Sequence, residues 1–227
     1  MPRISIDREQ VEPIFSTPIA YYKFPDDKHW ELKRAVRSAV KKVKEGPSQW
    51  SDAMYHFYQH AGEHLLYDND EPIFQYFHDW LKECYADYVL ELCGWNTTYD
   101  SFITDCWVNV TKDGGNQVIH THANAFVSGT YYLHMEDGAG PIIFMNPGAQ
   151  PERPYIGFDT LKTTQFNCTQ WYGNCEEMRL ILWPGNIAHL TAPTEKGATR
   201  TSISMNFMPA KFTAGAYDFS VVRSDES

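Results

Sequence analysis

The chain has 227 residues, of which 43% are hydrophobic and 21% charged, a composition typical of a globular protein with a substantial core. Its net charge of −10 disfavours nucleic acid and anionic membranes as partners, because both are bound through basic surfaces. No apolar run reaches the length of a transmembrane helix, and residues 1–5 lack the apolar stretch of a signal peptide. The five cysteines form no C-x-x-C pair and are expected to be reduced thiols. We therefore expect a cytoplasmic protein with a single domain over residues 1–227.

Residues 1–95 are expected to form a largely helical N-terminal part of this domain. A strand is predicted at residues 14–22, where strand-forming side chains are concentrated. A helix is predicted over residues 28–44, because Asp27 can cap it and Gly46-Pro47 ends it.

A second helix is predicted from Pro72 to the residue before Gly94, with Asp70 as its cap. Apolar residues recur along it at helical spacing and form a broad stripe, which indicates a helix that packs on a sheet. The stripe consists of Ile73, Phe74, Phe77, Leu81, Cys84, Tyr85, Tyr88, Val89 and Leu92.

Three histidines recur every four residues between the two helices, at positions 56, 60 and 64. The stretch from His60 to His64 matches H-x-x-E-H, a pattern of zinc peptidases. Gly62 disfavours the helix that this pattern requires, and no suitable acidic ligand follows on a downstream helix. We interpret the three histidines as surface residues, whereas the peptidase alternative predicts zinc bound to His60 and His64.

After Gly94 the hydrophobic period changes from helical to alternating, so that Trp107, Asn109 and Thr111 share one strand face. Short strands separated by turn residues indicate an antiparallel barrel or jelly roll over about residues 96–212, with the N-terminal helices packed on its sheet. The expected strands span residues 117–123, 127–134, 141–145, 163–171, 176–183, 187–192 and 200–208.

His120 and His122 lie on the same side of one predicted strand, because side chains alternate with period two. His189, on another strand, could join them at one metal ion and leave the opposite face of the metal open. Alternatively, these histidines belong to an ordinary polar network in the core.

Alternation in the strand that follows places Arg200, Ser202, Ser204 and Asn206 on one face. An arginine inside a barrel needs an anionic partner, since a buried unpaired charge is costly. A guanidinium next to a hydroxyl can hold a carboxylate in a bidentate grip. The alternative is an exposed strand face with a surface arginine.

Several short motifs recur in a characteristic order along the second half of the chain: Asn109, His120-Thr121-His122, Ser128-Gly129-Thr130-Tyr131-Tyr132-Leu133, Pro184-Gly185, His189 and Arg200-Thr201-Ser202. Together they resemble the double-stranded β-helix of iron(II)/2-oxoglutarate-dependent oxygenases. The resemblance is greatest to a subfamily of putative 2-oxoglutarate/iron(II) oxygenases found in marine bacteria and phages. If the protein is phage-encoded, we expect it to work in the cytoplasm of the host.

The resemblance implies a fold and a chemistry. The fold is α+β, with a jelly-roll, cupin-like core and N-terminal helices packed on the sheet. The chemistry is hydroxylation of an unidentified substrate with dioxygen, while 2-oxoglutarate becomes succinate and carbon dioxide. The implied iron(II) ligands are His120, His122 and His189, and the implied 2-oxoglutarate contacts are Arg200, Ser202, Tyr131 and Asn109.

One position departs from the family pattern, in which H-x-D/E supplies a histidine and a carboxylate to the metal. Here His122 occupies the place of the acid, so either the site has three histidines or a carboxylate reaches it from elsewhere. Two alternative functions remain at this point. One is a three-histidine cupin-type dioxygenase independent of 2-oxoglutarate, and the other is a non-catalytic jelly-roll structural or binding protein.

Overall fold

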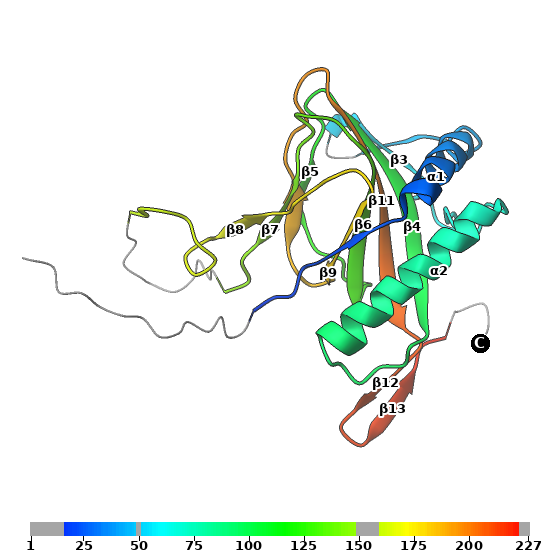
Figure 1. The fold of residues 1–227 in the computed structure, drawn as a ribbon, viewed down its shortest axis with the longest axis vertical. Coiled ribbons are helices and arrows are strands. Elements are labelled where there is room, and N and C mark those ends of the chain that lie inside the picture. The colour runs from blue at the N-terminus through cyan, green and yellow to red at the C-terminus, as the bar shows by residue number, and fades with distance from the viewer. Residues whose placement is uncertain (1–15, 49–50, 149–158, 223–227) are drawn as a thin grey trace, which may run out of the picture.

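A computed structural model describes residues 16–48, 51–148 and 159–222, which form two antiparallel sheets and a small hairpin (Figure 1). The main sheet has seven strands in the order β1-β9-β6-β11-β4-β3-β2, and the minor sheet has four in the order β5-β10-β7-β8. The main sheet contains β1 (Ala20–Lys23), β2 (Gly46–Ser48), β3 (Ser51–Phe57), β4 (Ser101–Lys112), β6 (Val127–Met135), β9 (Arg179–Pro184) and β11 (Thr199–Pro209). The minor sheet contains β5 (Gln117–His120), β7 (Ile142–Met145), β8 (Gln170–Tyr172) and β10 (His189–Thr191). This is the antiparallel jelly roll that the alternating pattern predicts.

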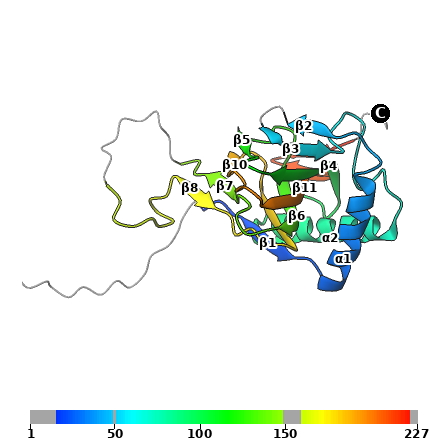
Figure 2. The same ribbon diagram turned by 90° about the horizontal axis from the view of Figure 1, so that it is seen from above.

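Two helices, α1 (Asp26–Ala39) and α2 (Pro72–Ala86), cover one face of the main sheet (Figures 1 and 2). A π-helical segment, η1 (Asp87–Leu92), continues α2, and Gly94 then turns the chain with a positive φ of 64°. The predicted apolar stripe is buried against the sheet except for Leu92, which is 54% exposed, and the ring centroids of Phe77 and Tyr131 lie 5.0 Å apart. No helix in the described part of the chain is long and apolar enough to cross a membrane.

The N-terminal part supplies strands to the main sheet as well as helices. β1 pairs with β9 at one edge, and β2 and β3 extend the other edge beyond β4. The predicted first strand begins later than expected, at Ala20, and residues 14 and 15 lie outside the described part of the chain. The first helix ends at Ala39 rather than at residue 44.

The strands expected after residue 96 form with shifted ends. The segment predicted at 163–171 is a strand only in β8, which extends away from the body with β7 (Figure 2). A terminal hairpin of β12 (Lys211–Ala214) and β13 (Tyr217–Ser220) was not expected, and it lengthens the structure beyond residue 212.

The core has two parts, one on each face of the main sheet. The larger part lies between this sheet and the helices, and it includes Tyr131. The smaller part lies between the two sheets and includes Tyr132, Phe144, Ile181 and Trp183. The space between the sheets is therefore only partly filled by apolar side chains, and the rest of it is lined by polar ones.

Candidate metal and cosubstrate site

Three histidines meet between the two sheets, as the sequence predicts. His120 ends β5, His122 follows in the next turn, and His189 begins β10, where the strand register places it opposite His120. One nitrogen from each ring lies within 4.8 Å of the other two. Among the described residues, this is the one group of histidine, cysteine or acidic side chains close enough to hold a metal ion.

Hydrogen bonds fix the same tautomer in all three rings. The Nδ1 atoms of His120 and His189 each donate to the backbone carbonyl two residues earlier, at 2.8 and 2.9 Å. The Nδ1 atom of His122 donates to the side-chain oxygen of Asn206 at 2.5 Å. Because an amide oxygen only accepts, each Nδ1 carries the proton and each Nε2 presents a lone pair. The donor set therefore fits a transition-metal ion that takes imidazole ligands.

The surroundings keep two of these imidazoles neutral, those of His122 and His189. Burial, followed by the neighbouring His120, lowers the pKa of His189 to about 3. Burial also lowers the pKa of His122. At neutral pH both rings are unprotonated, so a metal ion would not have to displace a proton from them.

Close backbone packing holds the turn that carries His122. Its amide donates to the carbonyl of Gly185 at 3.0 Å, on the connection between β9 and β10. A Cβ atom at Gly185 would collide with the carbonyl oxygen of Ala125. The Pro184-Gly185 motif thus allows the connection before His189 to lie directly against the turn after His120.

Arg200 lies in the same cavity on β11 and is only 2% exposed. One terminal nitrogen donates to the carbonyl of Gly140, the other donates to Thr111 Oγ1 at 3.2 Å, and Nε has no partner among the described residues. None of the ion pairs formed by the described residues includes it. Burial lowers the pKa of Arg200, but a guanidinium stays charged in proteins. A buried cation with an unused donor and no carboxylate partner has the chemistry needed to bind an anion.

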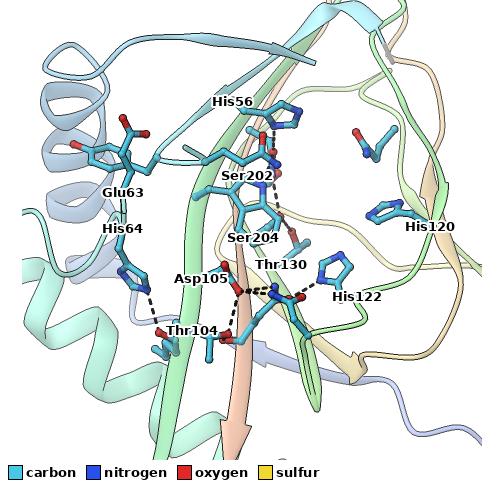
Figure 3. A pocket seen from close by; sticks show the side chains of 18 of the residues that line it. His56, Glu63, His64, Thr104, Asp105, His120, His122, Thr130, Ser202 and Ser204 are labelled. Atoms are coloured by element: carbon cyan, nitrogen blue, oxygen red, sulfur yellow. Dashed lines mark hydrogen bonds between the residues drawn. The ribbon is translucent and has the colours of Figure 1, made fainter. Parts of the chain in front are cut away.

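The cavity that contains Arg200 and the histidines has a volume of about 910 Å³. Its wall on the main sheet includes the predicted polar face of β11, where Ser202 is 5% exposed (Figure 3). Both sheets contribute to the lining, which includes Trp107, Asn109, Thr130, Tyr132, Ile142, Trp183, Thr191, Ser202, Ser204 and Asn206.

Asn109 lines the cavity at the centre of a hydrogen-bond network. Its side-chain oxygen accepts from His56 Nδ1 at 2.6 Å and from Trp107 Nε1 at 3.0 Å, and its Nδ2 donates to Ser204 Oγ at 2.9 Å. His56 is 8% exposed and burial lowers its pKa, so its interpretation as a surface residue is wrong. Sequence reasoning missed His56 as a cavity residue because the four-residue histidine spacing hides the alternation of β3.

Tyr131 does not line the cavity, so its predicted contact with the cosubstrate is wrong. Its hydroxyl bonds to His29 Nδ1 at 2.7 Å in the core under the helices. Tyr132 lines the cavity instead, and its hydroxyl accepts from Cys175 Sγ at 3.0 Å. The two tyrosines differ because adjacent residues on a strand face opposite sides of the sheet.

The H-x-x-E-H stretch forms no metal site. His64 Nε2 donates to the carbonyl of Ile103 at 3.1 Å, and its Nδ1 accepts from the amides of Leu66 and Tyr67, each at 3.3 Å. Both ring nitrogens are therefore in use, and His64 is buried rather than on the surface. Figure 3 shows His64 and Glu63 set apart from His120 and His122.

Known proteins resemble this chain in sequence over part of its length and in fold over most of it. Residues 105–206 match the family model described as a putative 2OG-Fe(II) oxygenase, and this span contains all three histidines and Arg200. The matched region is a little under half of the chain, and over it the sequence is similar to the 2OG-Fe(II) oxygenases. This match and the oxygenase neighbours support an oxidoreductase, and the fold is the double-stranded β-helix of these enzymes.

Several solved structures share the architecture at low sequence identity. A 2OG-Fe(II) oxygenase family oxidoreductase from Burkholderia pseudomallei is 15% identical, with 82% of this chain and 83% of that chain covered and a TM-score of 0.52. A prolyl-4-hydroxylase from Pseudomonas putida is 12% identical, with 86% of this chain and 94% of that chain covered and a TM-score of 0.57. HygX from Streptomyces hygroscopicus, solved with nickel and 2-oxoglutarate bound, is 11% identical, with 90% of this chain and 88% of that chain covered and a TM-score of 0.56. A comparison with curated proteins finds no match.

Proposed function

We propose that this oxygenase holds iron(II) on His120, His122 and His189 and binds 2-oxoglutarate through Arg200. The observation that carries the proposal is the presence, in one cavity, of three convergent Nε2 lone pairs and a buried guanidinium without a carboxylate. When bound, iron with 2-oxoglutarate and dioxygen supplies an oxidation that releases succinate and carbon dioxide and hydroxylates an organic substrate.

The chain's own residues bind and orient. Arg200 receives the distal carboxylate of 2-oxoglutarate, and its unused Nε–H is available to that anion. Ser202, on the same strand face, offers a hydroxyl beside it, and Tyr132 takes the role first expected for Tyr131. Asn109 is held by its own network and presents its amide to the cosubstrate or to the substrate.

We also propose that the protein works in the cytoplasm on a substrate other than nucleic acid. All five cysteines are free thiols, which suits a reducing compartment. The net charge of −10 opposes association with a polyanion.

An anaerobic titration tests the proposal. The full-length protein is loaded with iron(II), and 2-oxoglutarate is added while the visible metal-to-ligand charge-transfer band is recorded. We expect a saturable band in the wild type and about tenfold to hundredfold weaker 2-oxoglutarate binding in Arg200→Ala, because charge-assisted hydrogen bonds are lost.

Arg179→Ala is the matched control, since Arg179 pairs with Glu176 outside the cavity and should titrate like the wild type. Absence of a band in the wild type would contradict the proposed chemistry. A band that Arg200→Ala leaves unchanged would contradict the role of Arg200.

A further inference from the structure

The metal site contains no carboxylate, although enzymes with this fold commonly use two histidines and one carboxylate. In the described part of the chain, no aspartate or glutamate joins the group formed by His120, His122 and His189. Three imidazoles bring no negative charge to a divalent ion. The nearest carboxylate connected to the group by hydrogen bonds is therefore of interest.

That carboxylate belongs to Asp105, which reaches His122 through one intervening amide. Asp105 on β4 pairs with Asn206 on β11 in the sheet register. Asn206 Nδ2 donates to Asp105 Oδ2 at 3.0 Å, and Asn206 Oδ1 accepts from His122 Nδ1 at 2.5 Å. Figure 3 shows this chain of hydrogen bonds running from Asp105 to the His122 ring.

The carboxylate determines which way the amide faces. Only the NH₂ group of Asn206 can donate to Asp105, so its oxygen must face His122. Ser128 Oγ also donates to that oxygen, at 3.3 Å, and Asn206 is 4% exposed. The amide is thus locked in the orientation that makes His122 present its Nε2.

Two further hydrogen bonds hold the carboxylate of Asp105 in place. The same oxygen accepts from Thr104 Oγ1 at 3.0 Å and from Asn124 Nδ2 at 3.1 Å. These partners fix the carboxylate where it polarises the Asn206 amide. An outer carboxylate connected to a metal-binding histidine raises the basicity of that ligand and fixes its ring.

We infer that Asp105 is a positioning residue that acts through Asn206 to orient His122 and to supply negative charge to a metal site without a carboxylate ligand. This inference rests on the proposed function, because it assumes that His122 binds iron. It explains how the site tolerates a histidine at the position of the usual acid.

Metal affinity provides the first test, measured by anaerobic iron(II) titration of the full-length protein. We expect Asp105→Asn to bind iron(II) about tenfold to hundredfold more weakly than the wild type. Asp26→Asn is the matched control, because it makes the same chemical change at a carboxylate that pairs with Lys23 outside the cavity. We expect this control to stay within about twofold of the wild type, a change of about 0.4 kcal/mol.

A charge exchange separates an electrostatic role from a structural one. The double variant Asp105→Asn with Asn206→Asp moves the carboxylate one residue closer to His122 and keeps the total charge. We expect it to regain most of the iron(II) affinity lost in Asp105→Asn. We also expect the iron reduction potential to rise in Asp105→Asn and to fall again in the double variant.

Three results would overturn the inference: unchanged affinity in Asp105→Asn, equal losses in Asp105→Asn and Asp26→Asn, or a double variant that folds and still binds as weakly as Asp105→Asn. If circular dichroism shows that the double variant does not fold, the comparison of the two single variants decides alone. Failure of the wild type to bind iron(II) would instead contradict the proposed function, so the two failures are distinguishable.

Discussion

At the scale of single residues, Tyr131 and Tyr132 show how one step along a strand separates two roles. Tyr131 bonds to His29 under the helices, whereas Tyr132 lies between the sheets in the cavity. Both are almost completely buried. Their different surroundings predict different effects for the same chemical change.

Removing each hydroxyl separately tests this assignment. We expect Tyr132→Phe to weaken 2-oxoglutarate binding by about twofold to tenfold, the effect of one hydrogen bond of about 0.5–1.5 kcal/mol. We expect Tyr131→Phe to leave 2-oxoglutarate binding unchanged and to lower the free energy of unfolding by about 1 kcal/mol, since the Nδ1 atom of His29 loses its partner. Anaerobic 2-oxoglutarate titration and urea unfolding measure the two effects, and the opposite pattern would restore Tyr131 to the site.

The sequence predicted those cavity residues whose side-chain chemistry alone suggests a role. It missed those whose role depends on a residue in a neighbouring strand. His120, His122, His189 and Arg200 could be selected because imidazoles and a guanidinium at strand spacing suggest a metal and an anion. Asp105 could not, because its role depends on the register of β4 against β11. The one available signal was alternation, which places it on the same face as Trp107 and Asn109.

At the scale of elements, a charged network attaches α1 to the sheet beneath it. Glu177, just before β9, accepts from Lys33 Nζ at 2.6 Å and from His29 Nε2 at 2.9 Å, both on α1. It also contacts His134 Nδ1 on β6 at 3.0 Å. The side chains of Lys33 and His29 are 8% and 0% exposed, so Glu177 compensates a cation that has little access to water.

This network predicts acid sensitivity. Burial alone would raise the pKa of Glu177, but hydrogen bonds from Lys33, His29 and His134 outweigh it and hold the pKa at about 2. The unfolded chain has a glutamate pKa of about 4.3, so the stabilisation is present above that pH and is lost as pH falls towards 2.

Removing the charge of Glu177 tests the network. We expect Glu177→Gln to lower the free energy of unfolding at pH 7 by about 1–3 kcal/mol, and the difference from wild type to shrink as pH falls below about 4. Urea unfolding between pH 7 and pH 3 measures this. Glu176→Gln is the control, because its pair with Arg179 is exposed and contributes little. A constant difference across this pH range would show that the carboxylate of Glu177 is not responsible.

Helices and strands with a clear hydrophobic period could be predicted from the sequence. Strands without such a period, which form by pairing with another strand, could not. The apolar stripe of α2 and the alternation in β4, β6 and β11 have clear periods of 3.6 and 2. β3 was missed because its histidine belongs to a four-residue repeat that suggests no strand. The β12–β13 hairpin lies beyond the expected end of the jelly roll, and its Phe212 and Phe219 rings stack at 4.9 Å.

At the scale of the whole molecule, the site depends on two sheets facing each other. His120 and His189 come from the minor sheet, whereas Arg200 and Asn206 come from the main sheet. Strand patterns alone predict a sandwich or barrel but do not determine which strands pair. The resemblance to iron(II)/2-oxoglutarate oxygenases implied a double-stranded β-helix, and the family match over residues 105–206 agrees with that resemblance.

The central claim is a three-histidine metal site with 2-oxoglutarate held by Arg200. A crystal structure of the full-length protein, loaded with iron(II) and 2-oxoglutarate without oxygen, tests it most directly. The account predicts iron bound by Nε2 of His120, His122 and His189, the distal carboxylate on Arg200, and Asp105 still bonded to Asn206 rather than to the metal. Iron bound directly by Asp105, or a 2-oxoglutarate carboxylate away from Arg200, would contradict it.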